Sequence, residues 1–258
     1  MPEWTVISKQ QHAKARYQPR QAFTHAASQI ITPVLLTELP RLVTQHILAF
    51  IPNEEHFQVI ALLGVEQGCN LYVNHDGRWL GDYVPANVRG YPFTLAPDNK
   101  GQRVLCIDAD QLTDAPDAGQ ALFDEKGKPT EAISKMLDFL NQCDADRLRT
   151  QAAVDALQKT GVIQPWALEV SRGEGETPLK IKGLYRIDEK TLNTLEAATY
   201  AKLQGAPMAL AYAHLFSVHQ LNQLTERAKY HARQQQKPEV ADLEELFGDN
   251  DILSFDNI

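Results

Sequence analysis

The order in which two hydrophobic patterns follow one another most constrains the fold of this chain. Over the first 110 residues, short runs of Val, Ile, Leu and aromatic residues alternate with turn residues, which is typical of strands. These runs cover residues 4–8, 47–51, 57–65, 70–74 and 103–108. From about residue 130 the apolar side chains instead recur every three or four positions, which predicts helices. A strand-rich region followed by helices favours an α+β fold.

The second half of the chain contains one more strand pair between helical segments. A helix from about residue 130 and a second helix over 144–159 precede strand-like runs at 164–170 and 178–187, which flank a polar, glycine-rich turn. This arrangement predicts a second β-hairpin. A last long helix is expected over 206–232, because that stretch is strongly apolar at its start and polar towards its end.

We therefore interpret residues 1–232 as one mixed α+β domain. It combines an N-terminal antiparallel β region, central helices, the second β-hairpin and the long C-terminal helix. A chain of 258 residues is long enough for such a domain to bury roughly 70–75% of its unfolded surface. Residues 233–258 are expected to form a polar linker followed by an acidic tail.

Two shorter stretches carry more local predictions. Thr32 followed by Pro33 is typical of a helix start, and Pro40 should end or kink that helix. Two short helical pieces are therefore expected over 32–46. The stretch 70–83 predicts a hairpin whose corner is an Asp-Gly pair.

The net charge of −8 is concentrated in the tail. Seven of the 33 acidic residues lie in the last twenty positions, where there is no Lys or Arg, so the body carries 26 acidic and 25 basic residues. A neutral body without a basic stripe argues against nucleic-acid binding, because phosphate neutralisation supplies most of that affinity. The tail also carries large apolar side chains, which we expect to dock into a groove on a protein partner or on another copy of the chain: Leu243, Leu246, Phe247, Ile252 and Phe255.

Neither a membrane span nor a metal site is indicated. No apolar run approaches the roughly 20 residues that cross a bilayer, and the first seventeen residues lack the apolar segment of a secretory signal. We therefore expect a cytoplasmic protein. The three cysteines, Cys69, Cys106 and Cys143, lie far apart and outside any CxxC or His/Cys cluster, so no disulfide framework, metal or cofactor is expected.

The common catalytic signatures GxSxG, HExxH, GxxxxGK[ST] and GxGxxG after a strand do not occur in the sequence. Two isolated polar residues remain as weak catalytic candidates. Asp108 directly follows a buried-looking strand, where a carboxylate can act as a general base, although loop carboxylates without such a role are common. His214 lies in an apolar helix, where a hydrogen-bonded core histidine is more frequent than a base or a ligand.

The segment 79–93, WLGDYVPANVRGYPF, is the strongest candidate for recognition. It holds four aromatic side chains and one cation: Trp79, Tyr83, Tyr91, Phe93 and Arg89. Arginine suits carboxylate recognition and ring stacking, and the two prolines of the segment reduce its loop entropy, which would preorganise such a surface. The alternative is that the rings pack against the first sheet and that the arginine pairs with a neighbouring carboxylate.

Several stretches of the chain together resemble the bacterial SapC family. The most specific are GRW, YVPA and RGYPF within residues 77–93, and GLYRIDEKTLN at 183–193. The order and spacing of all the similar stretches cover roughly residues 4–227. The usual pattern resembles YVPAxLRRYPF, so Val88 and Gly90 depart from it and one arginine stands where the pattern has two.

The resemblance implies little about mechanism. The family name is linked with surface-layer and serum-resistance genes and sometimes with peptide transport. Related genes often lie near genes for flavin-dependent halogenase-like and cupin-like oxygenase proteins. The family supplies no established catalytic residue, and a permease role does not fit a chain without membrane spans.

The sequence therefore favours a non-catalytic binding or accessory protein that recognises a peptide or protein partner through the segment 79–93. Self-association through the tail is one form that such binding can take. The alternative is an enzyme, or an enzyme partner, in the oxidative modification of aromatic residues or peptides, and it requires Arg89, Asp108 and His214 to converge in one pocket. A surface-layer component is a third alternative, and it requires export.

Overall fold

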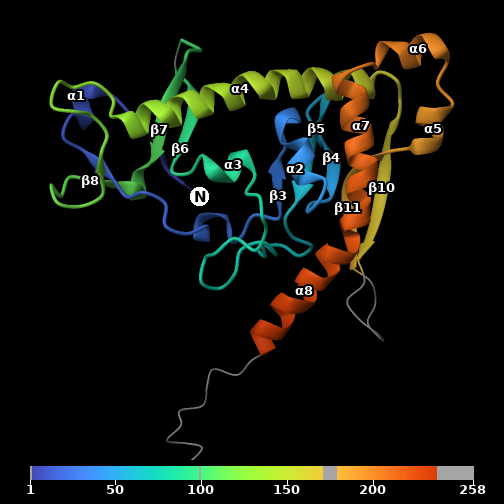
Figure 1. The fold of residues 1–258 in the computed structure, drawn as a ribbon, viewed down its shortest axis with the longest axis horizontal. Coiled ribbons are helices and arrows are strands. Elements are labelled where there is room, and N and C mark those ends of the chain that lie inside the picture. The colour runs from blue at the N-terminus through green and yellow to red at the C-terminus, as the bar shows by residue number, and fades with distance from the viewer. Residues whose placement is uncertain (1, 99, 171–178, 237–258) are drawn as a thin grey trace, which may run out of the picture.

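The computed structural model describes residues 2–98, 100–170 and 179–236, and its fold is α+β as predicted (Figure 1). In this part of the chain, three antiparallel sheets lie against one long helix, α4 (Glu131–Gln158). The largest sheet has the strand order β10-β11-β4-β5-β3. Its strands are β3 (Ile31–Pro33), β4 (Leu48–Asn53), β5 (His56–Leu62), β10 (Ile163–Val170) and β11 (Leu179–Ile187). The β10–β11 pair confirms the second hairpin.

The two smaller sheets among the described residues lie beside the first half of α4 (Figure 1). One has the order β1-β7-β6, and the other has the order β8-β2-β9. Their strands are β1 (Trp4–Val6), β2 (Arg16–Tyr17), β6 (Phe93–Pro97), β7 (Arg103–Asp108), β8 (Leu112–Thr113) and β9 (Gln120–Ala121). After β3, β4 and β5 of the large sheet, the chain therefore returns to pair β7 with the N-terminal strand β1.

Helix α4 is continuous over 28 residues, and the predicted division into two helices near residue 144 is wrong. Because no Gly or Pro lies between Glu131 and Gln158, nothing in the backbone interrupts the hydrogen-bond ladder. The helix ends just before Gly161, whose φ of 71° suits the residue after a helix. A single rigid helix consequently spans the large sheet and the small sheets (Figure 1).

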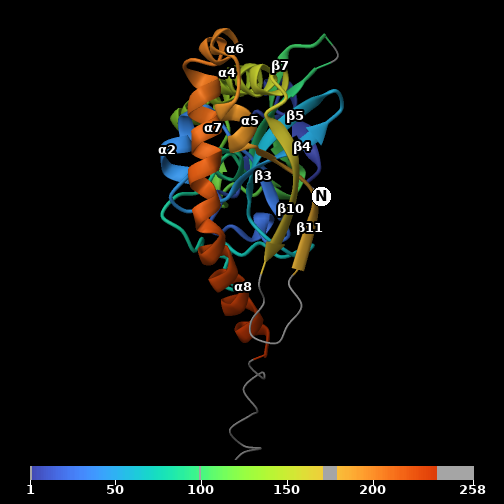
Figure 2. The same cartoon turned by 90° about the vertical axis from the view of Figure 1, so that its right-hand side faces the viewer.

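The helices after β11 first pack on the face of the large sheet that α4 covers, and the last of them extends beyond the sheet (Figure 2). They are α5 (Glu189–Asn193), α6 (Ala197–Lys202), α7 (Ala206–Ser217) and α8 (Leu221–Gln236). A 3-10 turn over Val218–Gln220 divides the predicted C-terminal helix into α7 and α8, and α8 continues past residue 232. No helix in the described ranges is both long enough and apolar enough to cross a membrane.

Short helical turns fill the connections: α1 (Lys9–His12), α2 (Leu39–Leu42), α3 (Ala86–Arg89), and 3-10 turns at Thr24–Ala26, Leu36–Glu38 and Ala109–Gln111. Thr32 does not begin a helix, because it pairs with Ala61 in the sheet. Pro40 lies in the first turn of α2, where its missing N–H costs no hydrogen bond. Two short pieces do form, but they start only at Leu36.

The predicted hairpin over 70–83 is reduced to one bridge, between Val73 and Trp79, within the described residues. The side chain of Asn70 explains the difference. Its Nδ2 donates to the carbonyl of Ala26 at 2.9 Å, and its Oδ1 accepts from the amide of Tyr72 at 2.9 Å. These bonds hold the first arm in an irregular path instead of a strand.

Strands β4 and β5 are buried on both faces, which explains their continuous apolar sequence. One face packs under α4 and α7 and contributes Leu48, Phe50, Val59 and Ala61 to the first core cluster. The other face contributes Ile47, Ala49, Ile60 and Leu62 to a second cluster, together with β10 and α8. A third cluster fills the space between α4 and the small sheets.

Gly64, directly after β5, offers a sharp test of the loop that leads into the segment 79–93. A Cβ atom there would lie 2.1 Å from the carbonyl oxygen of Cys69 and 3.1 Å from Cγ2 of Ile30. Because a backbone carbonyl has little room to move, we expect Gly64→Ala to lower the free energy of unfolding by about 1–3 kcal/mol in urea titrations. The exposed Gln67→Ala in the same loop is the control, and equal stabilities of the two variants would contradict the packing argument.

Candidate functional site

The aromatic side chains of the segment 79–93 do not all face the same way. Trp79 is partly buried against the second core cluster, where its ring centroid lies 5.5 Å from that of Tyr72 and 5.6 Å from that of Phe23. Its Nε1 donates to the carbonyl of Tyr83 at 2.9 Å. Phe93 is buried in the third cluster with its ring 4.9 Å from that of Tyr17. These two rings therefore pack the interior.

Tyr83 and Arg89 form a hydrogen-bonded chain with Glu38. The Tyr83 hydroxyl donates to Oε1 of Glu38 at 3.0 Å and accepts from Nη2 of Arg89 at 2.9 Å. The Arg89 guanidinium also lies over two rings, 5.2 Å from the centroid of Tyr83 and 5.0 Å from that of Phe139 on α4. Arg89 is thus held in one orientation by a hydroxyl and two aromatic faces.

Glu38 is the buried centre of this network. Its Oε1 also accepts from the amide of Ala86 at 2.6 Å, and its Oε2 accepts from the amide of Leu35 at 3.1 Å. Burial raises the pKa of Glu38, and the three hydrogen bonds and the charge of Arg89 oppose that shift. The Glu38 carboxylate therefore connects the start of α3 to the 3-10 turn before α2. Through the Tyr83 hydroxyl it also holds the Arg89 guanidinium in place.

These residues line a cleft of about 610 Å³ between α2, α3 and α4. Each of the three helices supplies one arginine: Arg41 from α2, Arg89 from α3 and Arg149 from α4. Arg89 is half-buried, whereas Arg41 and Arg149 are exposed. Arg41 lies over the same Tyr83 ring, at 5.3 Å from its centroid.

The carboxylates in the wall of the cleft form hydrogen bonds with the backbone and with hydroxyl groups instead of ion pairs with these arginines. Asp146 accepts from the backbone amide of Thr37 at 3.1 Å and from its hydroxyl at 2.6 Å, and Glu38 accepts from backbone amides as described. Across the described residues, none of the three guanidinium groups forms an ion pair with a carboxylate, and Nε of Arg89 is buried without a hydrogen-bond partner. The cleft therefore presents cationic groups with free hydrogen-bond donors, which suits an anion.

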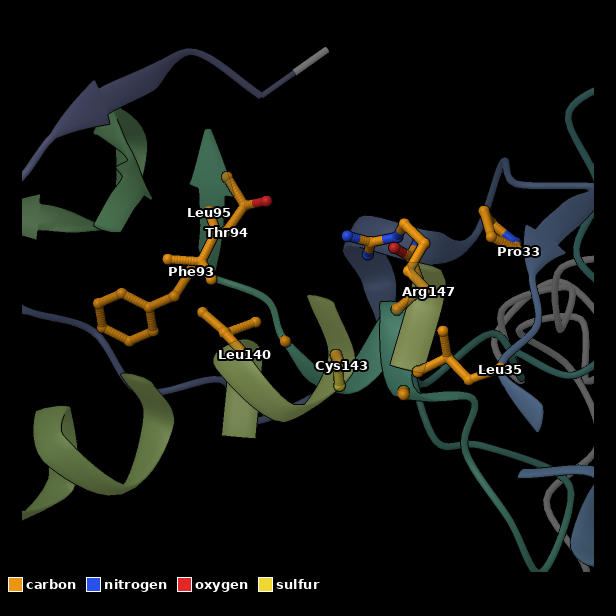
Figure 3. A pocket seen from close by; sticks show the side chains of 11 residues that line it. Pro33, Leu35, Phe93, Thr94, Leu95, Leu140, Cys143 and Arg147 are labelled. Carbon is orange, nitrogen blue, oxygen red and sulfur yellow. The ribbon is translucent and has the colours of Figure 1, made fainter. Parts of the chain in front are cut away.

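A smaller cavity of about 50 Å³ lies beside the cleft and shares its Leu35, Ala86 and Cys143 wall (Figure 3). Gly90 lines this cavity, and a Cβ atom there would lie 3.2 Å from Cδ2 of Leu140. The second arginine position of the RRYPF pattern consequently faces the smaller cavity.

Tyr91 opens onto a different groove, of about 570 Å³, which it lines with Arg20 and His25. Its ring stacks on His25 at 4.0 Å, and its hydroxyl donates to Oδ2 of Asp108 at 2.8 Å. Burial, followed by the bond to Asp108, raises the pKa of Tyr91 to about 12. Asp108 is buried at the end of β7, and its side chain accepts this hydrogen bond from Tyr91.

His214 is a core histidine on α7. Its side chain is fully buried, and Nδ1 lies 2.9 Å from the carbonyl of Leu48. Burial lowers its pKa to about 4, so the ring is neutral at neutral pH. It lines another cavity with Trp166 and residues of β11. Arg89, Asp108 and His214 therefore do not line one common pocket among those described.

The sequence interpretation missed Arg41, Arg149, Phe139 and Glu38. Nothing in the local pattern of α4 marks Arg149 or Phe139, because their role depends on how α4 lies against α3. Glu38 carried a usable signal, since it is the single charge in the apolar run VLLTEL. The tail residues Leu243, Leu246, Phe247, Ile252 and Phe255 lie outside the described residues, so their predicted docking stays a prediction.

Comparison with known proteins gives one match. A family model described as SapC matches residues 7–224, nearly the whole α+β body, and confirms the resemblance seen in the sequence. No curated protein and no solved structure matches the chain.

Proposed function

The chain belongs to the SapC family, and we propose that it is a binding protein that holds a carboxylate-bearing peptide or protein segment in the arginine cleft between α2, α3 and α4. The observation that carries the proposal is the convergence of Arg41, Arg89 and Arg149 without ion-pair partners among the described residues. Guanidinium groups bind carboxylates with two parallel hydrogen bonds, so three of them favour an acidic ligand strongly.

The cleft also offers apolar contact. The ring of Phe139 is half-buried beside Arg89, and the Tyr83 ring lies beneath Arg41 and Arg89. A volume of about 610 Å³ accommodates a few side chains of a peptide. An acidic segment with an interspersed large apolar residue would therefore satisfy both the cations and the ring faces.

The network behind Arg89 supports a preorganised site. Tyr83, Glu38 and Phe139 hold the guanidinium before any ligand arrives, so little side-chain entropy is lost on binding. The catalytic alternative requires Arg89, Asp108 and His214 in one pocket, and their separation gives that alternative no geometric support. We therefore place recognition, and not catalysis, in the arginine cleft.

Neutralising the two exposed arginines tests this function. The double variant Arg41→Gln/Arg149→Gln leaves the Glu38–Tyr83–Arg89 chain intact, so it should fold normally. We expect it to bind a fluorescent peptide of alternating Glu and Phe at least about tenfold more weakly than the unmodified chain, measured by anisotropy, which corresponds to about 1.4 kcal/mol. The same peptide with Gln in place of Glu should bind neither protein.

Lys135→Gln is the matched control for this experiment. It removes one cation from the same helix α4, but Lys135 is exposed, is paired with Glu131 and does not line the cleft. Its peptide affinity should stay within about twofold of the unmodified chain. If the double variant binds as tightly as this control, the cleft is not the recognition site.

A further inference from the structure

We propose that the segment that occupies the arginine cleft is the acidic tail, residues 239–258, of a second copy of this chain. The inference rests on the proposed function, because it names the ligand of the same cleft. Two copies of the chain then associate by reciprocal exchange of their tails.

The arginine cleft and the acidic tail carry complementary charges. The cleft carries three arginines without carboxylate partners among the described residues. The tail carries seven Asp and Glu residues and no Lys or Arg, whereas the rest of the chain is nearly neutral. Residues 106–125 hold six acidic residues and no Lys or Arg, and the tail holds seven, so the most acidic stretch of twenty residues is matched in charge to the arginine cleft.

The tail also carries large apolar residues. They are interspersed with the acidic ones, as in the sequence DLEELF at 242–247, where Leu243 and Phe247 alternate with carboxylates. The cleft offers the same combination in its wall, with Phe139 and the Tyr83 ring beside the guanidinium groups. A purely solvating acidic tail would not need large apolar side chains.

The direction of α8 favours a second copy over the same molecule. In both views the helix leaves the body at the end of the molecule opposite to α4, and its C-terminal end points away from the region of α2 and α4 (Figures 1 and 2). The last described turn of α8 therefore lies away from the cleft of its own molecule. Two molecules related by a two-fold axis can exchange tails without reversing the chain, and such an exchange gives a closed, self-complementary dimer.

The test uses the full-length protein and two variants, one with a changed cleft and one with a changed tail. The cleft variant is Arg41→Gln/Arg149→Gln, which keeps the tail. The neutral-tail variant replaces the seven acidic residues of 239–258 with Asn or Gln and keeps the cleft. In analytical ultracentrifugation we expect the unmodified chain to dimerise and each variant alone to have a dissociation constant at least about tenfold higher.

A mixture of the two variants tests directly whether the tail of one molecule binds the cleft of another. The mixture contains one intact cleft and one intact tail per pair, so a heterodimer should form where neither variant alone associates. Lys135→Gln should dimerise like the unmodified chain. A monomeric unmodified chain, self-association that survives in both variants, or a mixture that stays monomeric would each overturn the inference.

The outcome also separates this inference from the proposed function. The labelled Glu–Phe peptide should bind the neutral-tail variant at least as tightly as the unmodified chain, because no tail then competes for the cleft. If the peptide depends on Arg41 and Arg149 while self-association does not, the cleft binds acidic segments but the tail is not its ligand. If the peptide ignores both arginines, the proposed function fails as well.

Discussion

Replacing Glu38 with alanine is expected to lower the free energy of unfolding by about 3–5 kcal/mol. The buried carboxylate accepts hydrogen bonds from the amides of Leu35 and Ala86 and from the Tyr83 hydroxyl. Removing it leaves two buried N–H donors without a partner and takes the only described carboxylate contact away from the Tyr83–Arg89 chain. Each unsatisfied buried donor costs about 1–3 kcal/mol, so the sum is large.

Chemical denaturation at neutral pH measures this effect, and Glu38→Gln resolves its parts. The amide has the same shape and keeps one acceptor oxygen, so its loss of stability should be clearly smaller than that of the alanine variant. Glu131→Ala, at the exposed start of α4, removes a carboxylate that pairs with Lys135 in solvent and should leave the unfolding transition unchanged. An alanine variant at position 38 as stable as this control would show that the two amides have other partners.

The same change has a functional consequence. Arg89 keeps its orientation through Tyr83, and Tyr83 keeps its orientation through Glu38. We infer that the shape of the cleft depends on Glu38, a carboxylate that is only 3% exposed and faces the interior instead of the solvent. Stability and recognition are therefore joined at this side chain, whereas Arg41 and Arg149 can be changed without disturbing the interior.

The sequence predicted the α+β class and most strands because local pattern and burial agree there. The runs at 47–51 and 57–65 are apolar on both sides, and the structure buries β4 and β5 between two core clusters. Prediction failed where tertiary pairing overrode a local signal. Thr32-Pro33 is a normal helix start, but these residues complete the edge of the sheet against β5, so they are extended.

The site was only half predictable for a related reason. The aromatic segment 79–93 is visible in the sequence, but its function depends on which rings face inward, and Trp79, Tyr83 and Phe93 all pack in core clusters. The three arginines of the cleft are separated by 48 and 60 positions in the chain, on three helices, and no spacing rule connects them. Their convergence follows from the course of α4 across the sheets, which only the fold determines.

Acidification is expected to destabilise the protein steeply between about pH 6.5 and pH 4, because two histidines are buried as neutral rings. Burial lowers the pKa of His46 to about 3 and that of His214 to about 4. Both pKa values lie below the value of about 6.5 in an unfolded chain, so the unfolded state binds protons first as the pH falls. The stability that the neutral rings contribute is complete above pH 6.5 and is lost as the pH falls towards their folded pKa values.

The expected slope of the free energy of unfolding against pH follows from the one proton that each unfolded histidine binds. Each contributes up to about 1.4 kcal/mol per pH unit, and because the unfolded histidines are only half-protonated at pH 6.5, the pair lowers the free energy of unfolding by about 3 kcal/mol between pH 6.5 and pH 5. Burial also lowers the pKa values of the half-buried His25 and His231, which act in the same direction. The raised pKa of Glu38 acts in the opposite direction, because its folded state binds a proton more readily than the unfolded chain does.

Urea titrations at several pH values between 6.5 and 5 test this, with His214→Asn as the informative variant. Asparagine can still donate to the carbonyl of Leu48 but does not titrate, so the slope of stability against pH should fall by about 1.4 kcal/mol per unit. Leu210→Val, in the same helix and fully buried, should lower stability at every pH and keep the slope of the unmodified chain. An unchanged slope in His214→Asn would mean that this ring is already protonated in the folded protein.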